Sequence, residues 1–184
     1  MLRIHVMGAS GSGTTTLGHQ LGARLAIPHL DTDDFFWMPT DPPYTTLRPV
    51  PERLALLRAE MDGCPEGWVL TGSALKWGTE LEALYDLIVF LTIDPALRMV
   101  RILSRERERY GARILPGGDM AETSRKFLDW AASYDTAGPE QRSLAAHEAW
   151  LSTQAAPVLR LDSAASVDDL VGAVLAHPVV GQAL

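Results

Sequence analysis

A glycine-rich loop near the start of the chain carries the residues best suited to chemistry. Between an apolar segment and a helical pattern it comprises, in order, Gly8, Ala9, Ser10, Gly11, Ser12, Gly13, Thr14, Thr15 and Thr16. The three glycines permit backbone angles that turn successive N–H groups inward, and a following helix adds the partial positive charge of its N-terminus. The loop therefore predicts a cradle for a phosphate chain, and a Gly/Ser turn without a ligand is the simpler alternative.

The predicted cradle lacks one charge. Gly8, Gly13 and Thr15 fit the phosphate-binding pattern G-x-x-x-x-G-K-[ST], but Thr14 stands where that pattern has its lysine. Lysine there is a point charge on the β- and γ-phosphates of a nucleotide, so its loss either abolishes transfer or moves the charge to another residue. Lysine is scarce throughout, with 14 Arg against only Lys76 and Lys126. Thr15 keeps the hydroxyl that we expect to ligate magnesium.

Two carboxylates, Asp31 and Asp33, follow the second predicted strand. Ligands of parallel α/β sheets bind in the crevice at the carboxyl ends of the strands, so we expect both side chains to face the phosphates. No acid ends the third predicted strand, and magnesium would therefore depend on Thr15, Asp31 and water. The alternative is that Asp33 or Asp34 only caps the next helical segment.

Aromatic and basic residues follow these acids. Four aromatic side chains could stack on a base, enclose a sugar or belong to the core: Phe35, Phe36, Trp37 and Tyr44. Arg48 and Arg53 could bind an acceptor that carries phosphate or carboxylate. Lys76, just after the third strand, could bind substrate and supply the charge that Thr14 lacks. A solvated surface position is the alternative for all three.

Six arginines lie between positions 98 and 113, on a helix that Asp94-Pro95 should open and Gly111 should end. At about 100° per residue, four of them fall within about 80° of one another, namely Arg98, Arg101, Arg105 and Arg109. We expect the opposite face to pack in the core, with Ala96, Met99, Val100 and Leu103. The planar fork of arginine suits a phosphoryl group in transfer, and a solvated face with salt bridges to Glu106 and Glu108 is the alternative. Glycines at 111, 117 and 118 predict a small lid.

Short apolar runs alternate with amphipathic ones along the whole chain. They predict strands over 2–7, 27–30, 68–71, 87–93 and 158–161. Strands separated by helices imply an α/β fold, with a five-stranded parallel sheet covered by helices on both faces. Leu17, Leu21 and Leu25 give the first helix an apolar stripe, and Gly18 and Gly22 would let it approach the sheet closely. The segment 39–51 should form a loop, and Ser166 should cap the last helix.

Length and charge narrow the class of protein. The 184 residues suggest one domain over 1–184, and the formal net charge of −7 disfavours nucleic acid or an anionic membrane as the main partner. A single cysteine, Cys64, forms no internal disulfide, which fits a reducing cytoplasm. The longest stretch without charged residues, 4–23, is rich in Gly, Ser and Thr, so neither a membrane span nor a signal peptide is expected.

The glycine loop, placed between a strand and a helix, resembles that of the P-loop small-molecule kinases, which include nucleoside monophosphate, shikimate and gluconate kinases. Archaeal-type cytidylate kinases also carry threonine in place of the lysine, so the resemblance implies that Thr14 need not abolish activity. The pair Asp31 and Asp33 resembles the Asp-x-Asp of shikimate and gluconate kinases. That likeness implies a magnesium-side role for Asp31 and contact with the acceptor hydroxyl for Asp33. In nucleoside monophosphate kinases, arginines beside a mobile lid hold the phosphoryl group during transfer. The resemblance implies the same role for Arg101 and Arg105.

We therefore expect a P-loop NTPase fold that binds ATP and Mg²⁺ and phosphorylates a small molecule, in the first place a nucleoside monophosphate as in the adenylate kinases. Because an acid beside the acceptor would repel a phosphate, a gluconate- or shikimate-like metabolite kinase stays open. A third reading is a nucleotide-binding regulator that lost transfer together with its lysine. The sequence fixes neither the acceptor nor the oligomeric state.

Overall fold

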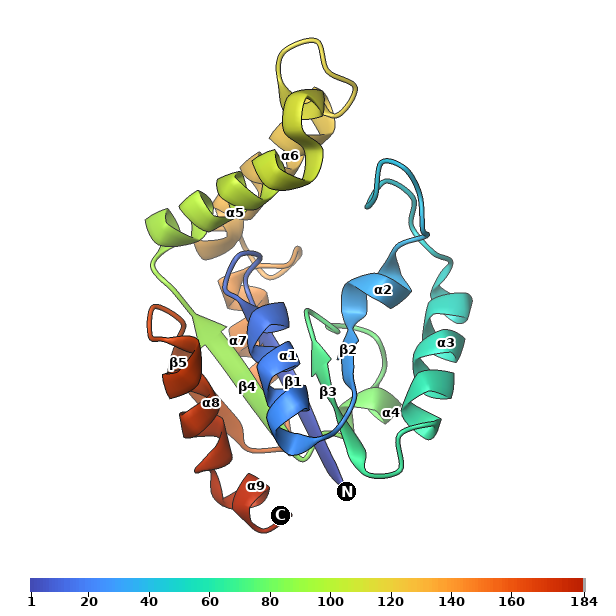
Figure 1. Ribbon diagram of the computed structural model, residues 1–184, viewed down its shortest axis with the longest axis vertical. Helices are drawn as coiled ribbons and strands as arrows, with labels where there is room; N and C mark the ends of the chain where they lie inside the picture. Colours follow the sequence, from blue (N-terminus) through green and yellow to red (C-terminus); the bar gives the residue numbers. More distant parts are fainter. Residues whose placement is uncertain (184) are drawn as a thin grey trace. The chain divides into compact units, whose positions relative to one another are not determined.

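A five-stranded parallel sheet organises the computed structural model, which describes residues 1–183 (Figure 1). Its strands are β1 (Leu2–Gly8), β2 (His29–Asp31), β3 (Gly67–Thr71), β4 (Leu87–Thr92) and β5 (Val158–Asp162). They pair in the order β2-β3-β1-β4-β5, and each neighbouring pair is parallel. The structure confirms the predicted α/β fold and all five predicted strands, with ends displaced by one or two residues at most.

Helices connect the strands. They are α1 (Thr14–Leu25), α2 (Thr32–Phe36), α3 (Val50–Asp62), α4 (Thr79–Glu82), α5 (Pro95–Tyr110), α6 (Ala121–Ala132), α7 (Leu144–Leu151), α8 (Val167–Leu175) and α9 (Pro178–Gly181), with short 3₁₀ turns η1 (Gly111–Ile114) and η2 (Ser133–Asp135). Asp94 and Ser166 cap α5 and α8 as predicted, and Gly111 ends α5. The loop predicted for 39–51 ends earlier, because Pro51 lies in the first turn of α3, where a missing N–H costs no hydrogen bond. None of the helices described in residues 1–183 is long and apolar enough to cross a membrane.

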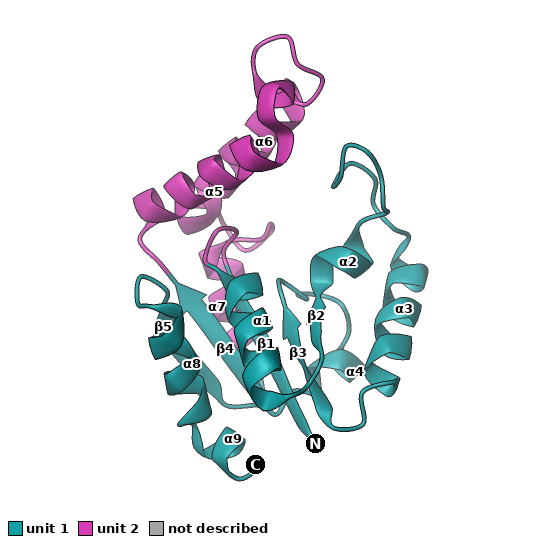
Figure 2. Cartoon of the chain, in the orientation of Figure 1, with its two compact units in different colours: residues 1–8, 13–92, 154–184 teal, residues 9–12, 93–153 magenta. Residues whose placement is uncertain are grey.

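The chain forms two compact units (Figure 2). Unit 1 contains residues 1–8, 13–92 and those from 154 onward, and it includes all five strands. Unit 2 contains residues 9–12 and 93–153, so it joins the middle of the glycine loop to the helical segment between β4 and β5.

In unit 1, alternate residues of the strands form an apolar core beneath α1 and α8. Leu17 and Leu21 of α1 are at most 1% exposed there, and they pack with strand residues such as Ile4, Val6 and Val89. A Cβ atom added to Gly18 would collide with the side chain of Thr71. The predicted close approach of α1 to the sheet is therefore present, and it requires glycine at position 18.

A buried histidine lies on the other face of the same sheet. His5 is fully buried, its Nδ1 lies 3.2 Å from Leu70 O, and its ring stacks on Tyr85 with the centroids 4.7 Å apart. Burial lowers the pKa of His5 to about 4, against a smaller opposite effect of the Leu70 carbonyl. The folded protein therefore keeps this ring neutral well below the pH at which a solvated histidine takes up a proton.

We expect this histidine to make the protein sensitive to acid. Between pH 6.5 and about 4 the unfolded chain binds a proton at His5 that the folded chain excludes, so stability falls as the pH falls. The full effect is about 3 kcal/mol. Urea unfolding at several pH values in the wild type and in His5→Phe measures it, because carboxylates contribute equally to both proteins. Equal pH slopes in the two proteins would contradict the assignment.

In unit 2, helix α5 turns a different face to the interior from the one predicted. Its buried residues are Arg98, Ile102, Glu106 and Tyr110. The expectation that Ala96, Met99, Val100 and Leu103 form the core face is wrong, because Ala96 is exposed, Met99 is only half-buried, and Val100 and Leu103 are 62% and 37% exposed.

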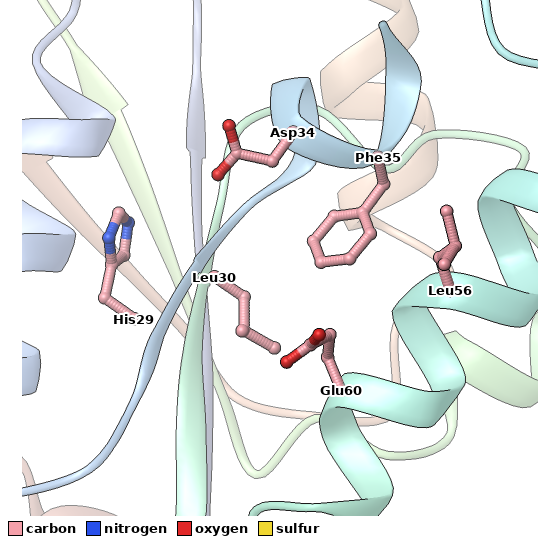
Figure 3. A pocket seen from close by; sticks show the side chains of 6 residues that line it. All are labelled: His29, Leu30, Asp34, Phe35, Leu56 and Glu60. Atoms are coloured by element: carbon pink, nitrogen blue, oxygen red, sulfur yellow. The ribbon is translucent and has the colours of Figure 1, made fainter. Parts of the chain in front are cut away.

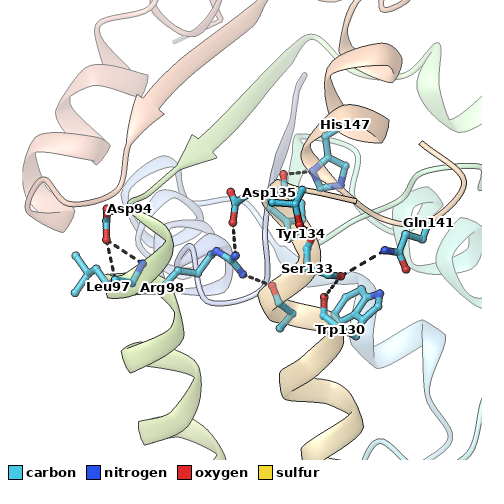
Figure 4. Close-up of polar contacts among 12 residues, drawn as sticks. Asp94, Leu97, Arg98, Trp130, Ser133, Tyr134, Asp135, Gln141 and His147 are labelled. Carbon is cyan, nitrogen blue, oxygen red and sulfur yellow. Dashed lines mark hydrogen bonds and ion pairs between the residues drawn. The ribbon is translucent and has the colours of Figure 1, made fainter. Parts of the chain in front are cut away.

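Hydrogen bonds at Arg98 explain this orientation (Figure 4). The side chain is 1% exposed, and it donates to Ala131 O at 2.8 Å and to Asp135 Oδ2 at 2.6 Å. Its guanidinium carbon lies 5.2 Å from the centroid of the Tyr134 ring. A buried charge is tolerated only when it is paired and hydrogen-bonded, and Arg98 meets both conditions.

Candidate phosphate-binding site

The glycine loop has the backbone that its sequence predicts. Gly11 and Gly13 have φ angles of 83° and 88°, in the left-handed region that favours glycine. Gly11 is constrained a second time, since a Cβ there would lie 2.7 Å from Cγ1 of Ile102 and 3.0 Å from Arg98 O on α5. At Gly13, by contrast, no atom of the described chain lies within 4 Å of an added Cβ. The loop is thus packed against α5 at one glycine and open at the other.

Polar groups in the loop and at the start of α1 are available to an anion. Gly13 is the N-cap of α1, and no side chain caps this helix end. Ser12 Oγ is fully buried and has no hydrogen-bond partner among residues 1–183, although Ser12 N donates to Ala9 O at 3.1 Å. A helix N-terminus with free amides attracts phosphate, so these groups fit a phosphate chain.

The predicted magnesium ligands lie together in unit 1. Thr15 Oγ1, at the start of α1, donates a 2.8 Å hydrogen bond to Oδ2 of Asp31, the last residue of β2. A hydroxyl and a carboxylate fit Mg²⁺, which binds one or two protein oxygens and completes its shell with water and substrate phosphates. No group of three His, Cys, Asp or Glu side chains within the described chain could hold a metal ion by itself.

Asp31 also begins the next helix. Its Oδ1 accepts a 3.0 Å hydrogen bond from Asp33 N, and Asp31 is the N-cap of α2. The capping role considered for Asp33 or Asp34 thus belongs to Asp31, while the carboxylates of Asp33 and Asp34 are exposed. Partial burial, and secondly the negative charge of Asp31, raise the pKa of Asp34. The chain therefore fixes the Asp31 carboxylate from two sides and leaves Asp33 next to it.

The basic residues after α2 support the loop in which they lie. Arg48 Nε and Nη2 donate to the carbonyl oxygens of Phe35 and Trp37 at 3.0 and 3.2 Å. Arg53 is 8% exposed, with its guanidinium carbon 4.0 Å from the Phe36 ring centroid. Their contacts are thus with the backbone and the aromatic residues of unit 1.

Lys76 is placed differently. It is exposed, in a left-handed turn with φ of 63°, and the neighbouring Trp77 is buried 5.1 Å from the guanidinium carbon of Arg53. Of the three predicted acceptor contacts, the structure brings Asp33 close to Asp31, engages Arg48 with the backbone, and leaves Lys76 in solvent.

A separate pocket of about 350 Å³ lies at the edge strand β2, between the β2–α2 segment and α3 (Figure 3). It is lined by His29, Leu30, Asp34, Phe35, Leu56 and Glu60. No residue of the glycine loop lines it, and of the side chains predicted as possible ligand contacts only Phe35 does. Its hollow is therefore distinct from the candidate phosphate site.

The predicted transfer arginines lie on α5 in unit 2. Arg101 and Arg105 are half-buried and flank Ile102, the residue that packs on Gly11, whereas Arg109 is exposed. The guanidinium carbon of Arg105 lies 5.9 Å from the Phe127 ring centroid. Two arginines thus leave α5 next to the position where this helix contacts the loop.

The segment predicted as a small lid follows α5. It contains the turn η1, and Arg113 Nη2 pairs with Asp119 Oδ2 at 2.6 Å, closing residues 113–119 into a loop. Both side chains are partly exposed, and the hydrogen bond and charge of Arg113 lower the pKa of Asp119. Gly111 and Gly117 have positive φ angles, which fits their predicted place at the ends of this segment.

One loop contact was not predicted. Arg142 Nη2 donates to Ser10 Oγ at 3.0 Å, and its guanidinium carbon lies 4.5 Å from the Trp130 ring centroid. Ser10 and Arg142 are 132 positions apart, so no local pattern connects them. The missing lysine indicated only that another residue could supply a charge, and nothing in the sequence pointed to Arg142.

Comparisons with known proteins agree with this fold. The family model described as AAA domain matches residues 4–125. An uncharacterized protein of Bacillus subtilis (strain 168), YqaC, is 44% identical over 172 residues, which cover 94% of both chains.

Two solved kinases share the fold at low sequence identity. A shikimate kinase from Bacteroides thetaiotaomicron has a TM-score of 0.55 at 17% identity, covering 95% of this chain and 96% of its own. A gluconokinase from Sinorhizobium meliloti 1021 has a TM-score of 0.52 at 15% identity, covering 98% and 92%. The chain therefore belongs to the AAA domain family, and its fold is that of the P-loop small-molecule kinases.

Proposed function

We propose that the protein is a phosphotransferase that uses Mg²⁺ and ATP to phosphorylate a small molecule. The observation that carries the proposal is the 2.8 Å contact between Thr15 Oγ1 and Asp31 Oδ2, directly after a glycine loop whose helix end has no side-chain cap. A hydroxyl and a carboxylate held together there suit the magnesium that accompanies a nucleoside triphosphate. The solved kinases that share the fold support the same class of reaction.

In this mechanism the protein acts by positioning and electrostatics. When bound, ATP would supply the phosphoryl group, and Mg²⁺ would neutralise part of its negative charge. The loop amides hold the phosphates, and Thr15 with Asp31 holds the metal. Asp33 orients the acceptor hydroxyl and takes up its proton as the oxygen attacks the terminal phosphorus. Arg101 and Arg105 stabilise the charge on the group in transfer, and ADP leaves.

For the acceptor, the geometry favours a hydroxyl over the nucleoside monophosphate that the sequence suggested first. A monophosphate needs a cation for its phosphate, yet Arg48 uses Nε and Nη2 on backbone carbonyls and Arg53 is buried against Phe36. An exposed carboxylate at Asp33 would repel an acceptor phosphate and attract a hydroxyl. We therefore place a hydroxylated metabolite first and a nucleoside monophosphate second.

An acceptor screen tests both assignments. We expect ADP formation from Mg²⁺·ATP to be stimulated by at least one polyhydroxylated acid or sugar and not by the common nucleoside monophosphates. The measurement is a coupled ADP assay over both compound sets, with product identified by mass. Stimulation by a monophosphate alone would reverse the order of the two acceptors. ATP binding without stimulation by any acceptor would favour the regulator and contradict a kinase.

The metal role of Asp31 predicts a magnesium-specific defect. We expect Asp31→Asn to reduce the gain in ATP affinity that Mg²⁺ provides by about tenfold, equal to about 1.4 kcal/mol, because a neutral amide is a poorer magnesium ligand. Calorimetric titration of ATP with and without Mg²⁺ measures that gain. Asp34→Asn is the matched control, since it removes the charge of a nearby carboxylate, in the first turn of α2. If Mg²⁺ raises the ATP affinity of Asp31→Asn as much as that of the wild type, Asp31 is not a magnesium ligand.

The transfer role of Arg105 predicts a defect in turnover with little loss of stability. We expect Arg105→Ala to lower kcat by about a hundredfold or more, because one cation on the transferred group is lost. Its half-buried position over Phe127 limits the fall in Tm to a few degrees. Arg107→Ala, which removes an exposed arginine of the same helix, is the control. A kcat of Arg105→Ala equal to that of the wild type would contradict the role of Arg105 in transfer.

A further inference from the structure

Unit 2 holds a preoriented arginine against the glycine loop. Arg142 is half-buried, donates to Ser10 Oγ at 3.0 Å and packs its guanidinium 4.5 Å from the Trp130 ring centroid. Stacking on an aromatic face fixes the plane of a guanidinium and leaves its N–H groups directed outward from the edge. The loop residue that it reaches, Ser10, belongs to the same unit, so this contact lies inside one compact body.

The backbone that follows Arg142 is anchored, and so is the helix that carries Trp130. The following residue, Ser143, is fully buried and is the N-cap of α7, where its Oγ accepts from Ala146 N at 3.0 Å and donates to Gly138 O at 2.7 Å. Trp130 lies next to Ala131, whose carbonyl accepts a 2.8 Å hydrogen bond from the buried Arg98. The platform and the arginine are therefore both held by buried hydrogen bonds.

Arg142 brings a positive charge to a loop that has no charged residue of its own. Thr14 replaces the lysine of the motif, and the residues at 8–16 are all neutral. A serine hydroxyl that accepts a hydrogen bond from Arg142 keeps its own hydrogen, which it can donate to a phosphate oxygen. A phosphate at Ser10 would thus receive one hydrogen bond from the hydroxyl and a charge-assisted one from the guanidinium.

We infer that Arg142, stacked on Trp130 and held at Ser10, supplies to the bound phosphate chain the positive charge that Thr14 lacks. The inference rests on the proposed use of a nucleoside triphosphate, and it makes Arg142 a phosphate-binding residue. Arginine at this position is rigid and always charged, whereas a loop lysine is a flexible point charge. The loop therefore holds its phosphates with a cation from elsewhere in the chain.

Charge exchange between the two positions is the test. We expect Arg142→Ala to weaken Mg²⁺·ATP and inorganic tripolyphosphate binding at least tenfold, measured by calorimetry, while adenosine affinity is unchanged. Adding Thr14→Lys to Arg142→Ala should restore tripolyphosphate affinity to within about threefold of the wild type, since the cation returns to the place in the pattern that lysine occupies. Arg107→Ala, the surface arginine control, should bind like the wild type.

The outcomes separate this inference from the proposed function. Wild-type affinity in Arg142→Ala overturns the inference, and so does a failure of Thr14→Lys to restore binding in a protein that melts normally. If Arg142→Ala does not fold, Arg142→Gln, which removes the charge but keeps a hydrogen-bonding side chain, provides the same comparison with and without Thr14→Lys. Tripolyphosphate binding that depends on Arg142, in a protein that transfers phosphate to no acceptor, would support the inference and contradict the kinase. A wild-type protein that binds neither ATP nor tripolyphosphate overturns both.

Discussion

The buried guanidinium of Arg98 is the interaction on which the helical unit depends. Its hydrogen bonds to Ala131 and Asp135 fix the end of α6 and the turn η2 against α5, and its own backbone carbonyl lies against Gly11 of the loop. A charge 1% exposed would be costly alone, so every partner must stay in place. Because α5 is oriented by this arginine, Ile102 meets Gly11, and Arg101 and Arg105 project from the helix close to one another beside that contact.

The same network supports the proposal that a loop without lysine binds phosphate. The hydrogen bond from Arg98 to Ala131 positions the end of α6, and Trp130 there supports Arg142 at Ser10. In unit 1, the constraint is different, since Thr15 and Asp31 are brought together by the start of α1 and the end of β2. Gly18 is what allows that helix to lie so close to the sheet. The proposed phosphate-binding cation and the proposed metal ligands are thus positioned by two separate sets of contacts.

Local patterns in the sequence were sufficient to predict the five strands of the sheet and the position of the glycine loop. Alternating apolar runs located all five strands, and the spacing of Gly8, Gly13 and Thr15 located the loop, because both signals involve residues close together in the chain. The buried face of α5 could not be predicted this way. Its apolar residues Val100 and Leu103 looked like core, but hydrogen bonding outweighed hydrophobicity at Arg98. Arg142 could not be found either, since Ser10 is 132 residues away and only the folded chain joins them.

In the proposed function, the glycine loop binds the phosphates of a nucleotide, with magnesium between Thr15 and Asp31. A crystal structure with Mg²⁺ and a non-hydrolysable ATP analogue tests it most directly. We predict the analogue's phosphates within the loop 8–16, with Mg²⁺ about 2.0–2.1 Å from Thr15 Oγ1 and coordinated by Asp31 directly or through a bound water. An analogue seated elsewhere, such as in the pocket beside His29 and Asp34, with the loop empty would contradict the account.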